Sequence, residues 1–395
     1  MPRVQFINRS FPPVPGATGA LLAELAPELV ARGWDVDIVA GRAGEETRAT
    51  GVTVRRVGSG HRGGSGRAPV WRRGLGFLGF YPRALRAALR HPRPDVYVIK
   101  TDPPLLAALG PVLRRRTGAP IIHWAQDVYP DVAEALNVLR PGGVVSRVAR
   151  RVVRRALPQY DAVVSVGRCM EDRLRAHGVA GDRLRTVSNW ALGSIRPVNT
   201  SNPFRVRHGL GDAFVVMYSG NLGMAHPFDA FIDAAEVLSR SHGDVAFVIV
   251  GDGARKAWVE AEIARRGLGS VTLLPFQPQE GLAESLSAAD LHLITMEPEL
   301  IGAVVPSKLY GVLAAGRPAL FVGPAGSEAA RALVEAEAGE VVAPDGRALV
   351  EAISRWKSDA EAHARACVNA RAATRRASDA ADAFDSLLRE VVAAQ

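Results

Sequence analysis

The feature that most constrains the fold is an alternation of short Val- and Ile-rich runs with longer helical patterns. In the first half of the chain the apolar runs cover residues 4–8, 36–40, 52–57, 96–100, 121–124 and 162–166. Between the first two runs, leucines recur at helical spacing and Gly33 follows the last helical turn. Strands separated by helices in this way are typical of βα units in a parallel sheet.

The same alternation begins again in the second half. Apolar runs cover residues 215–219, 246–250, 271–274, 291–294 and 319–322, and helical stretches separate them. Residues 191–204 hold two prolines and several Ser and Asn residues without apolar periodicity, which favours a linker. The sequence predicts an α/β fold of two Rossmann-like, doubly wound parallel-sheet domains that face each other across a cleft.

Domain boundaries follow from this pattern. We expect an N-terminal domain over residues 1–195 and a C-terminal domain over residues 205–370. Residues 371–395 are rich in Ala, Arg, Asp and Glu, and we expect them to form a helix that packs back on the first domain. In open parallel sheets ligands bind beyond the carboxyl ends of the strands, so the residues that follow each strand are the candidates for function.

The amino-acid composition indicates which class of partner the protein binds and in which compartment it is found. Lys and Arg number 49 against 40 Asp and Glu, a net charge of +9 that favours an anionic partner. The two cysteines, Cys169 and Cys367, are too few for a disulfide framework and favour a reducing compartment. No window of ~18 uncharged apolar residues and no export leader is present, so we expect a cytoplasmic protein. The basic residues are not interleaved with aromatic platforms, which argues against nucleic acid.

Two glycine-bearing turns lie between a strand and a helix, one in each half. The first, FPPVPGATG, contains Gly16 and Gly19, and the second, YSGNLG, contains Gly220 and Asn221. Glycine lets the backbone approach a ligand closely, and a helix N-terminus offers free N–H groups to a phosphate. An ordinary βα turn would also explain the first pair. A third turn, VGDG at 250–253, is interpreted as structural.

The stretch VVPSKLYGVLAAGRP places a lysine in apolar surroundings. Lys308 follows Ser307 and precedes Leu309 and Tyr310 at the start of a predicted helix. An ammonium group is costly to bury without a partner, so Lys308 is either a ligand for an anion or reaches solvent. We favour the anion, with the lysine adding to the helix dipole in holding a phosphate.

Another polar stretch ends the strand at 121–124. Asp127 lies in the sequence IIHWAQDVYPD and could orient an acceptor hydroxyl or take its proton, or could cap the next turn. His123 is interpreted as a core histidine. Asp35 and Asp37 form a D-x-D sequence, but we expect them at the wrong end of the sheet, and we assign no metal and no cofactor.

Together these segments resemble the family 4 retaining glycosyltransferases with the GT-B fold, especially a bacterial surface-polysaccharide branch that includes fucosamine transferases. The carriers of the resemblance are FPPVPGATG, QDVYPD, YSGNLGMAH, VGDG and VVPSKLYGVLAAGRP. The resemblance implies a metal-independent, retaining transfer from a nucleotide diphosphate sugar, commonly UDP-linked, held by the C-terminal domain. It implies a donor site made by the following residues: Gly16, Gly19, Gly220, Asn221, Ser307, Lys308, Leu309 and Tyr310.

Two departures from the family pattern change the expected roles. Gly311 and Ala303 stand where many relatives have a pair of glutamates, and Asn221 and His226 stand where they often have Arg and Lys. We therefore expect catalysis to depend on Lys308, His226 and Asp127. Gln126 joins Asp127 on the acceptor side.

The basic residues of the first domain favour an anionic membrane surface. They are Arg62, Arg67, Arg72, Arg73, Arg83, Arg86, Arg114, Arg115, Arg116, Arg147, Arg150, Arg151, Arg154 and Arg155. We expect peripheral association with the inner face of the cell membrane and a polyprenyl diphosphate-linked sugar as acceptor. A solvated surface and a small-molecule acceptor stay open, as do two other functions: a nucleotide-sugar 2-epimerase and a non-catalytic nucleotide-sugar-binding subunit.

Overall fold

A computed structural model describes residues 1–14, 16–41, 47–49, 51–58, 70–90, 92–198, 202–241 and 243–395, without the side chains of 47–49, 70–76 and 78. Contacts divide the chain into two compact units. Unit 1 contains Met1–Asn189, Gly302–Val305 and Arg376–Gln395, and unit 2 contains Trp190–Ile301 and Pro306–Arg375. No helix in the described ranges has the length and apolar character needed to cross a bilayer.

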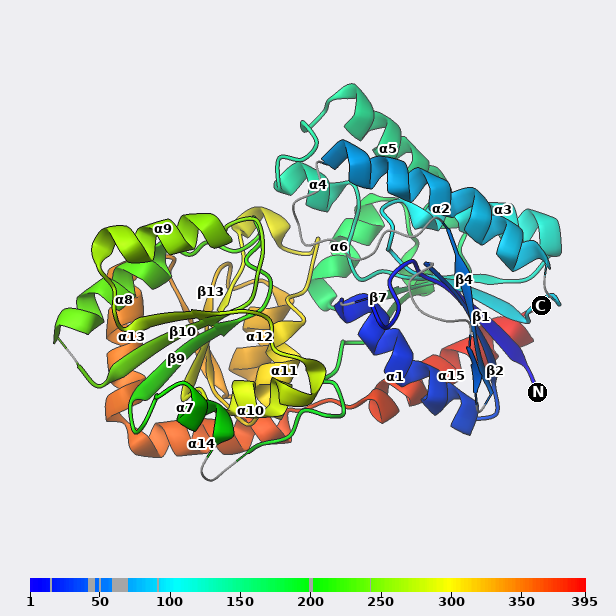
Figure 1. The fold of residues 1–395 in the computed structure, drawn as a ribbon. Coiled ribbons are helices and arrows are strands. Elements are labelled where there is room, and N and C mark those ends of the chain that lie inside the picture. Colours follow the sequence, from blue (N-terminus) through cyan, green and yellow to red (C-terminus); the bar gives the residue numbers. More distant parts are fainter. Residues whose placement is uncertain are drawn as a thin grey trace. The chain divides into compact units, whose positions relative to one another are not determined.

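The first unit is built on an eight-stranded sheet (Figure 1). Its strands are β1 (Arg3–Ile7), β2 (Asp35–Gly41), β3 (Thr47–Ala49), β4 (Val52–Val57), β5 (Val96–Ile99), β6 (Ile121–Trp124), β7 (Ala162–Ser165) and β8 (Leu184–Thr186). Their spatial order is β3-β4-β2-β1-β5-β6-β7-β8, and every pairing except β3–β4 is parallel. The order reverses between β1 and β5, the position at which such sheets bind ligands.

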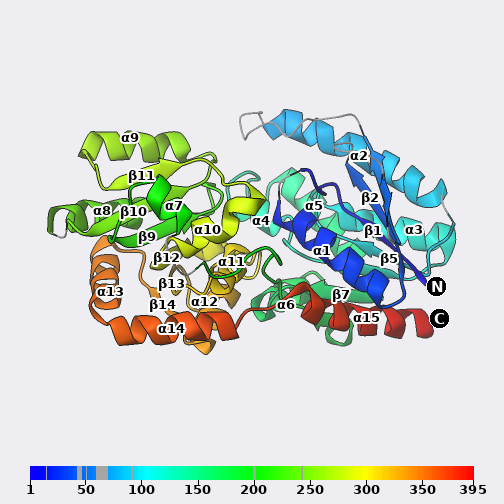
Figure 2. The ribbon, with the colours of Figure 1, turned by 60° about the horizontal axis from the view of Figure 1, so that its bottom comes forward.

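Helices cover both faces of this sheet. They are α1 (Ala17–Ala31), α2 (Val70–Arg90), α3 (Leu109–Thr117), α4 (Asp131–Ala135), α5 (Val144–Ala156), α6 (Arg168–Ala176) and α15 (Ala377–Ala393). The C-terminal helix α15 lies beside α1 (Figure 2). The Phe384 ring lies 4.7 Å from that of Trp124, and the Trp34 indole donates to Asp385 at 2.7 Å. Burial of an apolar face therefore holds this helix on unit 1.

The second unit has a six-stranded, fully parallel sheet in the order β11-β10-β9-β12-β13-β14. The strands are β9 (Phe214–Ser219), β10 (Val245–Val250), β11 (Val271–Leu274), β12 (Leu291–Thr295), β13 (Ala319–Val322) and β14 (Gly339–Val342). The helices are α7 (Pro203–Arg207), α8 (Asp229–Ser241), α9 (Lys256–Arg266), α10 (Leu282–Ser287), α11 (Lys308–Ala314), α12 (Glu328–Glu335), α13 (Gly346–Ser358) and α14 (Ala360–Ala372). Here the strand order reverses between β9 and β12.

The predicted α/β class with two parallel sheets is confirmed, and the main apolar runs are strands. The strands β3, β8 and β14 were not predicted, because their sequences TRA, LRT and GEVV hold at most two consecutive apolar residues and give no apolar run. Residues 371–395 are not one continuous helix, because α14 ends at Ala372 and α15 begins at Ala377. Before them, the Asp359 side chain caps α14 by accepting from Ala362 N.

Candidate donor and acceptor sites

In unit 2 the polypeptide turns sharply where β9 ends, at the point of strand-order reversal. Gly220 has φ 144°, and its N–H donates to the Val250 carbonyl at 2.9 Å. The Leu222 N–H donates to the Asp252 carbonyl at 3.0 Å. These two bonds fasten the turn that follows β9 to the turn that follows β10.

The VGDG turn that follows β10 packs closely against the turn that follows β9. A Cβ added at Gly251 would lie 1.9 Å from the Gly220 oxygen, and one at Gly253 would lie 2.4 Å from the Leu222 oxygen. Both residues also have positive φ angles, of 154° and 158°. The predicted structural role of this turn therefore has a physical basis: glycine is required for the two turns to touch.

A substitution tests this support. Gly251→Ala should destabilise the protein by about 3 kcal/mol or more, because the methyl group would overlap a backbone oxygen. Gly269→Ala is the matched control, since nothing lies within 4 Å of its added Cβ. Urea unfolding of both variants measures the difference. Equal stabilities would show that the two turns move apart without cost.

Lys308 extends from the first residue of α11 to the Gly220 turn. Its Nζ is buried without a hydrogen-bond partner among the described residues and lies 3.7 Å from the centroid of the Tyr218 ring. A Cβ added at Gly220 would lie 3.1 Å from the same Nζ. Burial lowers the pKa of Lys308 to about 7. An unpaired ammonium beside a glycine turn is the arrangement expected of an anion-binding group.

His226 lies close to the same lysine. Its Nδ1 lies 2.7 Å from the Thr295 carbonyl, and burial, with the charge of Lys308, lowers its pKa to about 3. The ring is therefore neutral at pH 7, and Nδ1 must carry the proton because a carbonyl only accepts. Nε2 is then an acceptor. In the free protein it can take a hydrogen bond from a hydroxyl group but cannot donate one to a phosphate.

The remaining predicted donor residues of unit 2 lie around this centre. Asn221 and Ser307 are exposed, and Ser307 immediately precedes α11. The backbone N–H groups of Leu309 and Tyr310 donate to the Pro306 and Ser307 carbonyls, both at 3.3 Å. Because those N–H groups are already engaged, any contribution to phosphate binding needs these long bonds to open.

In unit 1 the predicted acceptor residue Asp127 follows β6. It forms an isolated antiparallel bridge with Val304, and the Val128 N–H donates to the Ala303 carbonyl at 2.8 Å. Burial, and next the charge of Asp102, raises the pKa of Asp127 to about 6. The side chain is therefore a carboxyl whose protonation changes near neutral pH, as a proton-accepting group requires.

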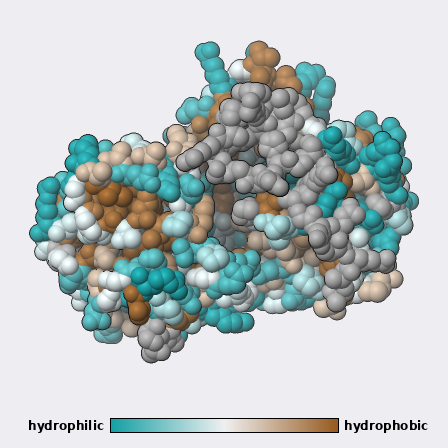
Figure 3. Space-filling view, viewed as in Figure 1, coloured by the Kyte–Doolittle hydropathy of each residue, from teal (hydrophilic) through white to brown (hydrophobic). Residues whose placement is uncertain are grey.

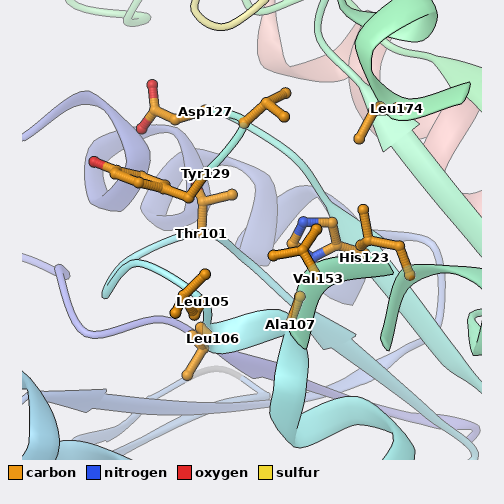
Figure 4. A pocket seen from close by; sticks show the side chains of 11 residues that line it. Thr101, Leu105, Leu106, Ala107, His123, Asp127, Tyr129, Val153 and Leu174 are labelled. Atoms are coloured by element: carbon orange, nitrogen blue, oxygen red, sulfur yellow. The ribbon is translucent and has the colours of Figure 1, made fainter. Parts of the chain in front are cut away.

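The neighbours of Asp127 include a tyrosine and a small cavity. Figure 4 shows the Asp127 carboxylate and the Tyr129 hydroxyl directed to the same side, away from His123. The cavity, about 20 Å³, is lined mainly by apolar side chains, together with Thr101, His123, Asp127 and Tyr129. The Thr101 Oγ1 is buried there without a hydrogen-bond partner. The carboxylate thus borders a space that offers both polar and apolar contacts.

Gln126 and His123 have structural partners. The Gln126 amide exchanges two hydrogen bonds with Asn189, each 3.0 Å long, which leaves it little to offer an acceptor. His123 Nδ1 lies 2.9 Å from the Ile99 carbonyl, and burial lowers its pKa to about 4. This is the arrangement of a core histidine.

The predicted glycines of the first turn differ from each other. A Cβ added at Gly19 would lie 2.7 Å from the Ser10 oxygen, so this glycine lets α1 meet the preceding loop. Gly16, at φ 152°, adjoins the start of α1, and no atom of the described residues lies within 4 Å of its added Cβ. Gly16 is thus the one of the two whose surroundings leave room for a ligand.

Two polar groups near Asp127 were not anticipated. Asp102 follows β5 and accepts from Arg9 at 3.0 and 3.1 Å and from the Ser10 hydroxyl. Lys100 is fully buried, with Nζ 3.1 Å from the Trp124 ring centroid and no hydrogen-bond partner in the ranges that the structure describes. Burial holds its pKa well below the ordinary value. Lys100 could have been identified from the sequence, because it is a charged residue at the end of the apolar run VYVIK.

The D-x-D sequence lies at the amino end of β2, as expected. Asp35 pairs with Arg3 at 2.5 Å, and the nearly buried Asp37 lies 3.6 Å from Arg55. Within the part of the chain that the structure describes, no group of three His, Cys, Asp or Glu side chains is arranged to hold a metal ion.

Comparison with known families matches both units. Residues 16–190 match the family described as "Glycosyl transferase 4-like domain", and residues 201–373 match "Glycosyl transferases group 1". Among solved structures, sucrose-phosphate synthase from Thermosynechococcus elongatus has a TM-score of 0.80 at 18% identity over 100% of both chains. WaaG, described as a glycosyltransferase involved in lipopolysaccharide biosynthesis, has a TM-score of 0.74 at 17% identity over 98% of this chain and 99% of its own.

Curated relatives are similar over part of their length. The chain is 29% identical to a putative colanic acid biosynthesis glycosyl transferase, WcaI of Escherichia coli, over 61% of this chain and 60% of WcaI. It is 29% identical to the probable glycosyltransferase WbjE of Pseudomonas aeruginosa over 65% of this chain and 64% of WbjE. The matches thus span less than two thirds of either relative. Both halves of the chain match these family models, and each unit contains a largely parallel sheet. The chain therefore belongs to the family 4, or group 1, glycosyltransferases, which are retaining enzymes with the GT-B fold.

Proposed function

We propose that this protein transfers a sugar, with retention, from a nucleotide diphosphate sugar to an acceptor hydroxyl, and that the donor is UDP-linked. The observation that carries the proposal is the buried, unpartnered ammonium of Lys308 against the Gly220 turn. This group lies where strand order reverses in unit 2. One solved structure of similar fold, HepE of Anabaena, was determined with UDP and glucose, at 17% identity and a TM-score of 0.72 over 98% of each chain.

On the donor side the chemistry requires positive charge. Breaking the bond between sugar and diphosphate leaves a negative charge on the phosphate oxygens, and a preplaced ammonium stabilises that charge in the transition state. Lys308 supplies the ammonium, while Gly220 lets the phosphate approach the backbone. Asn221 and Ser307 add exposed polar groups beside it. His226 accepts a hydrogen bond from a sugar hydroxyl through Nε2.

On the acceptor side the reaction must remove a hydroxyl proton. Asp127 has a raised pKa and is ionised above about pH 6, so it can orient the hydroxyl and accept its proton. A metal ion has no assigned part in this scheme.

The donor is tested by thermal shift with UDP, GDP, ADP and TDP and their common sugar conjugates. A nucleotide at ~100 times its dissociation constant should stabilise the folded protein by ~2.7 kcal/mol. We expect UDP and one UDP-sugar to give the largest shift. Well-folded protein that responds to no nucleotide would contradict the proposal, and a response to GDP alone would reassign the donor.

The acceptor is proposed to be a polyprenyl diphosphate-linked sugar at a membrane surface. Val144, Val145 and Val148 of α5 are 68%, 65% and 58% exposed. The arginines exposed on the same helix are Arg147, Arg151, Arg154 and Arg155. Apolar and basic side chains on one helix are the combination that binds anionic interfaces, and at the top of Figure 3 brown side chains lie next to teal ones over this helix.

The other basic residues contribute less to this argument. Arg150 pairs with Asp131 at 3.3 Å and with Glu134 at 2.5 Å, so its charge is already balanced. Arg114 pairs with Asp161 at 3.1 Å. Arg62 and Arg67 lie outside the described residues, and the side chains of Arg72 and Arg73 are also not described. Arg83, Arg86, Arg115 and Arg116 are exposed and add basic charge. Because α5 combines such charge with three exposed valines, the membrane proposal rests on α5.

Flotation with vesicles tests α5 directly. The protein should float with vesicles of equimolar phosphatidylcholine and phosphatidylglycerol and release at high salt, because exposed charges are screened. Val145→Glu should abolish flotation, while Val368→Glu, at a 62% exposed valine of α14, should not. Equal flotation of both variants, or none for the unaltered protein, would leave a soluble small-molecule acceptor as the better proposal.

Two alternatives predict different products from the donor alone. A nucleotide-sugar 2-epimerase would convert a UDP-sugar without any acceptor, and a binding subunit would hold the nucleotide without turnover. We expect neither epimerisation nor rapid hydrolysis. Chromatography of a UDP-sugar incubated with the protein, with and without acceptor, distinguishes the three.

A further inference from the structure

Tyr218 joins the groups of the donor centre in unit 2. Its side chain is fully buried, and its hydroxyl donates to the Asn221 carbonyl at 2.7 Å, across the turn that contains Gly220. Its ring meets Phe228 edge-on at 4.8 Å and His226 edge-on at 5.9 Å. The ring is thus fixed by packing on one side and by a hydrogen bond at its tip.

The free face of this ring supports Lys308. The Nζ lies 3.7 Å from the ring centroid, and no atom in the described part of the chain forms a hydrogen bond with it. A buried ammonium ordinarily has a carboxylate or carbonyl partner, because loss of hydration is costly. Here the negative face of an aromatic ring partly replaces that partner, and all three N–H donors stay uncommitted.

Gly220 sets the direction in which those donors are available. An added Cβ at this residue would lie 3.1 Å from both Cε and Nζ of Lys308, so the lysine tip rests closely against the turn and a side chain here would push it away. The ammonium therefore lies between the face of the Tyr218 ring and the backbone of Gly220. A ligand that approaches the Gly220 turn meets the ammonium in a fixed position.

We propose that Tyr218 is a positioning residue whose ring holds the Lys308 ammonium at the Gly220 turn, ready for the donor diphosphate. This inference rests on the proposed function, since it assigns the lysine a diphosphate ligand. A lysine held in this way loses its rotamer freedom on folding rather than on binding, which favours affinity. In this role Tyr218 acts through Lys308.

One consequence can be measured without any substitution. Burial lowers the pKa of Lys308 to about 7, and two phosphate charges would raise it again, so binding of UDP should take up protons between about pH 7 and pH 9. Titration calorimetry in buffers of different ionisation enthalpy reports this uptake. His226 and the phosphates of UDP can also contribute to the number of protons taken up. The same titration on Lys308→Met therefore gives the number of protons taken up by the lysine.

The decisive test replaces Tyr218 by phenylalanine and then by progressively fluorinated phenylalanines. Fluorine weakens the negative face of the ring while keeping its shape. We expect Tyr218→Phe to bind UDP within about threefold of the unaltered protein, and the most fluorinated ring to lose about tenfold in affinity. Uridine, which has no phosphate, should bind all of these proteins equally. A purely structural role for Tyr218 would leave UDP affinity unchanged along the series.

A second variant, Tyr218→Met, and its combination with Lys308→Met test whether the effect on UDP affinity comes from the ring acting through Lys308. Tyr218→Met removes the ring but fills its space, and it should weaken UDP and inorganic pyrophosphate while sparing uridine. In a Lys308→Met background the same change should weaken UDP no further. Equal UDP affinity across the fluorinated series would overturn the inference alone. Absence of UDP binding to the unaltered protein would overturn the proposed donor site instead.

Discussion

Lys308→Met should lower kcat/KM for the nucleotide-sugar donor by about a hundredfold to a thousandfold without lowering the melting temperature. The loss follows from removing the charge that we assign to the leaving diphosphate, an effect of the size seen when a preplaced electrostatic group is removed. The retained stability follows from the environment of Nζ, which is buried without a hydrogen-bond partner. Methionine fills the same space and carries no charge to desolvate.

The pH dependence of stability gives this prediction a second readout. The pKa of Lys308 falls from 10.5 to about 7 on folding, so between these values the unfolded chain holds more protons. Stability of the unaltered protein should therefore rise with pH across that window, and this contribution should be constant below about pH 7. The methionine variant should lack this rise. Urea unfolding at pH 7 and pH 10 measures it.

Lys256→Met is the matched control for Lys308→Met. Lys256 lies in the same unit, its side chain is 33% exposed, and it lies 3.9 Å from Glu260 on the same helix. We expect this control to keep both donor kinetics and stability. Full activity of Lys308→Met would contradict the donor site, and a large fall in its melting temperature would show that Nζ has a stabilising role in the free protein.

Asp127→Asn should lower kcat by about a hundredfold at pH 7.5, with a smaller change in donor affinity. Removal of a positioned proton acceptor typically costs this much or more. The asparagine can still orient a hydroxyl but cannot take its proton. Steady-state kinetics with a UDP-sugar and a lipid-linked acceptor measures the change.

The pH profile separates a proton acceptor from a structural carboxylate. The pKa of Asp127 rises from 3.8 to about 6 because of burial and the charge of Asp102, so activity should fall below about pH 6. Since the folded state holds the proton more tightly, stability should decrease as pH rises through this window, and Asp127→Asn should remove that decrease. Asp172→Asn, at an 82% exposed side chain of α6, is the control. An unchanged acid limb in Asp127→Asn would reassign the proton acceptor.

The sequence by itself determined the fold class and where to look in it. The alternation of apolar runs and helices predicted two parallel sheets, because strands and helices have different periods that survive in one dimension. The residues after each strand, among them Gly220 and Asp127, were identified because parallel sheets bind ligands at that edge. The apolar context of Lys308 was likewise readable, since a charge in an apolar stretch is costly wherever it folds.

Only the tertiary structure decided which of these residues are available for a ligand. Gln126 and Gly19 proved to be committed to Asn189 and to the loop at Ser10, while Lys308 is left unpaired over Tyr218. Asn189 lies 63 positions from Gln126 and Tyr218 lies 90 from Lys308, so no local pattern records these contacts. Periodicity reports which face of an element is buried. Hydrogen-bond partners and pKa shifts depend on distances between segments that are remote in the chain, and those distances exist only in the folded protein.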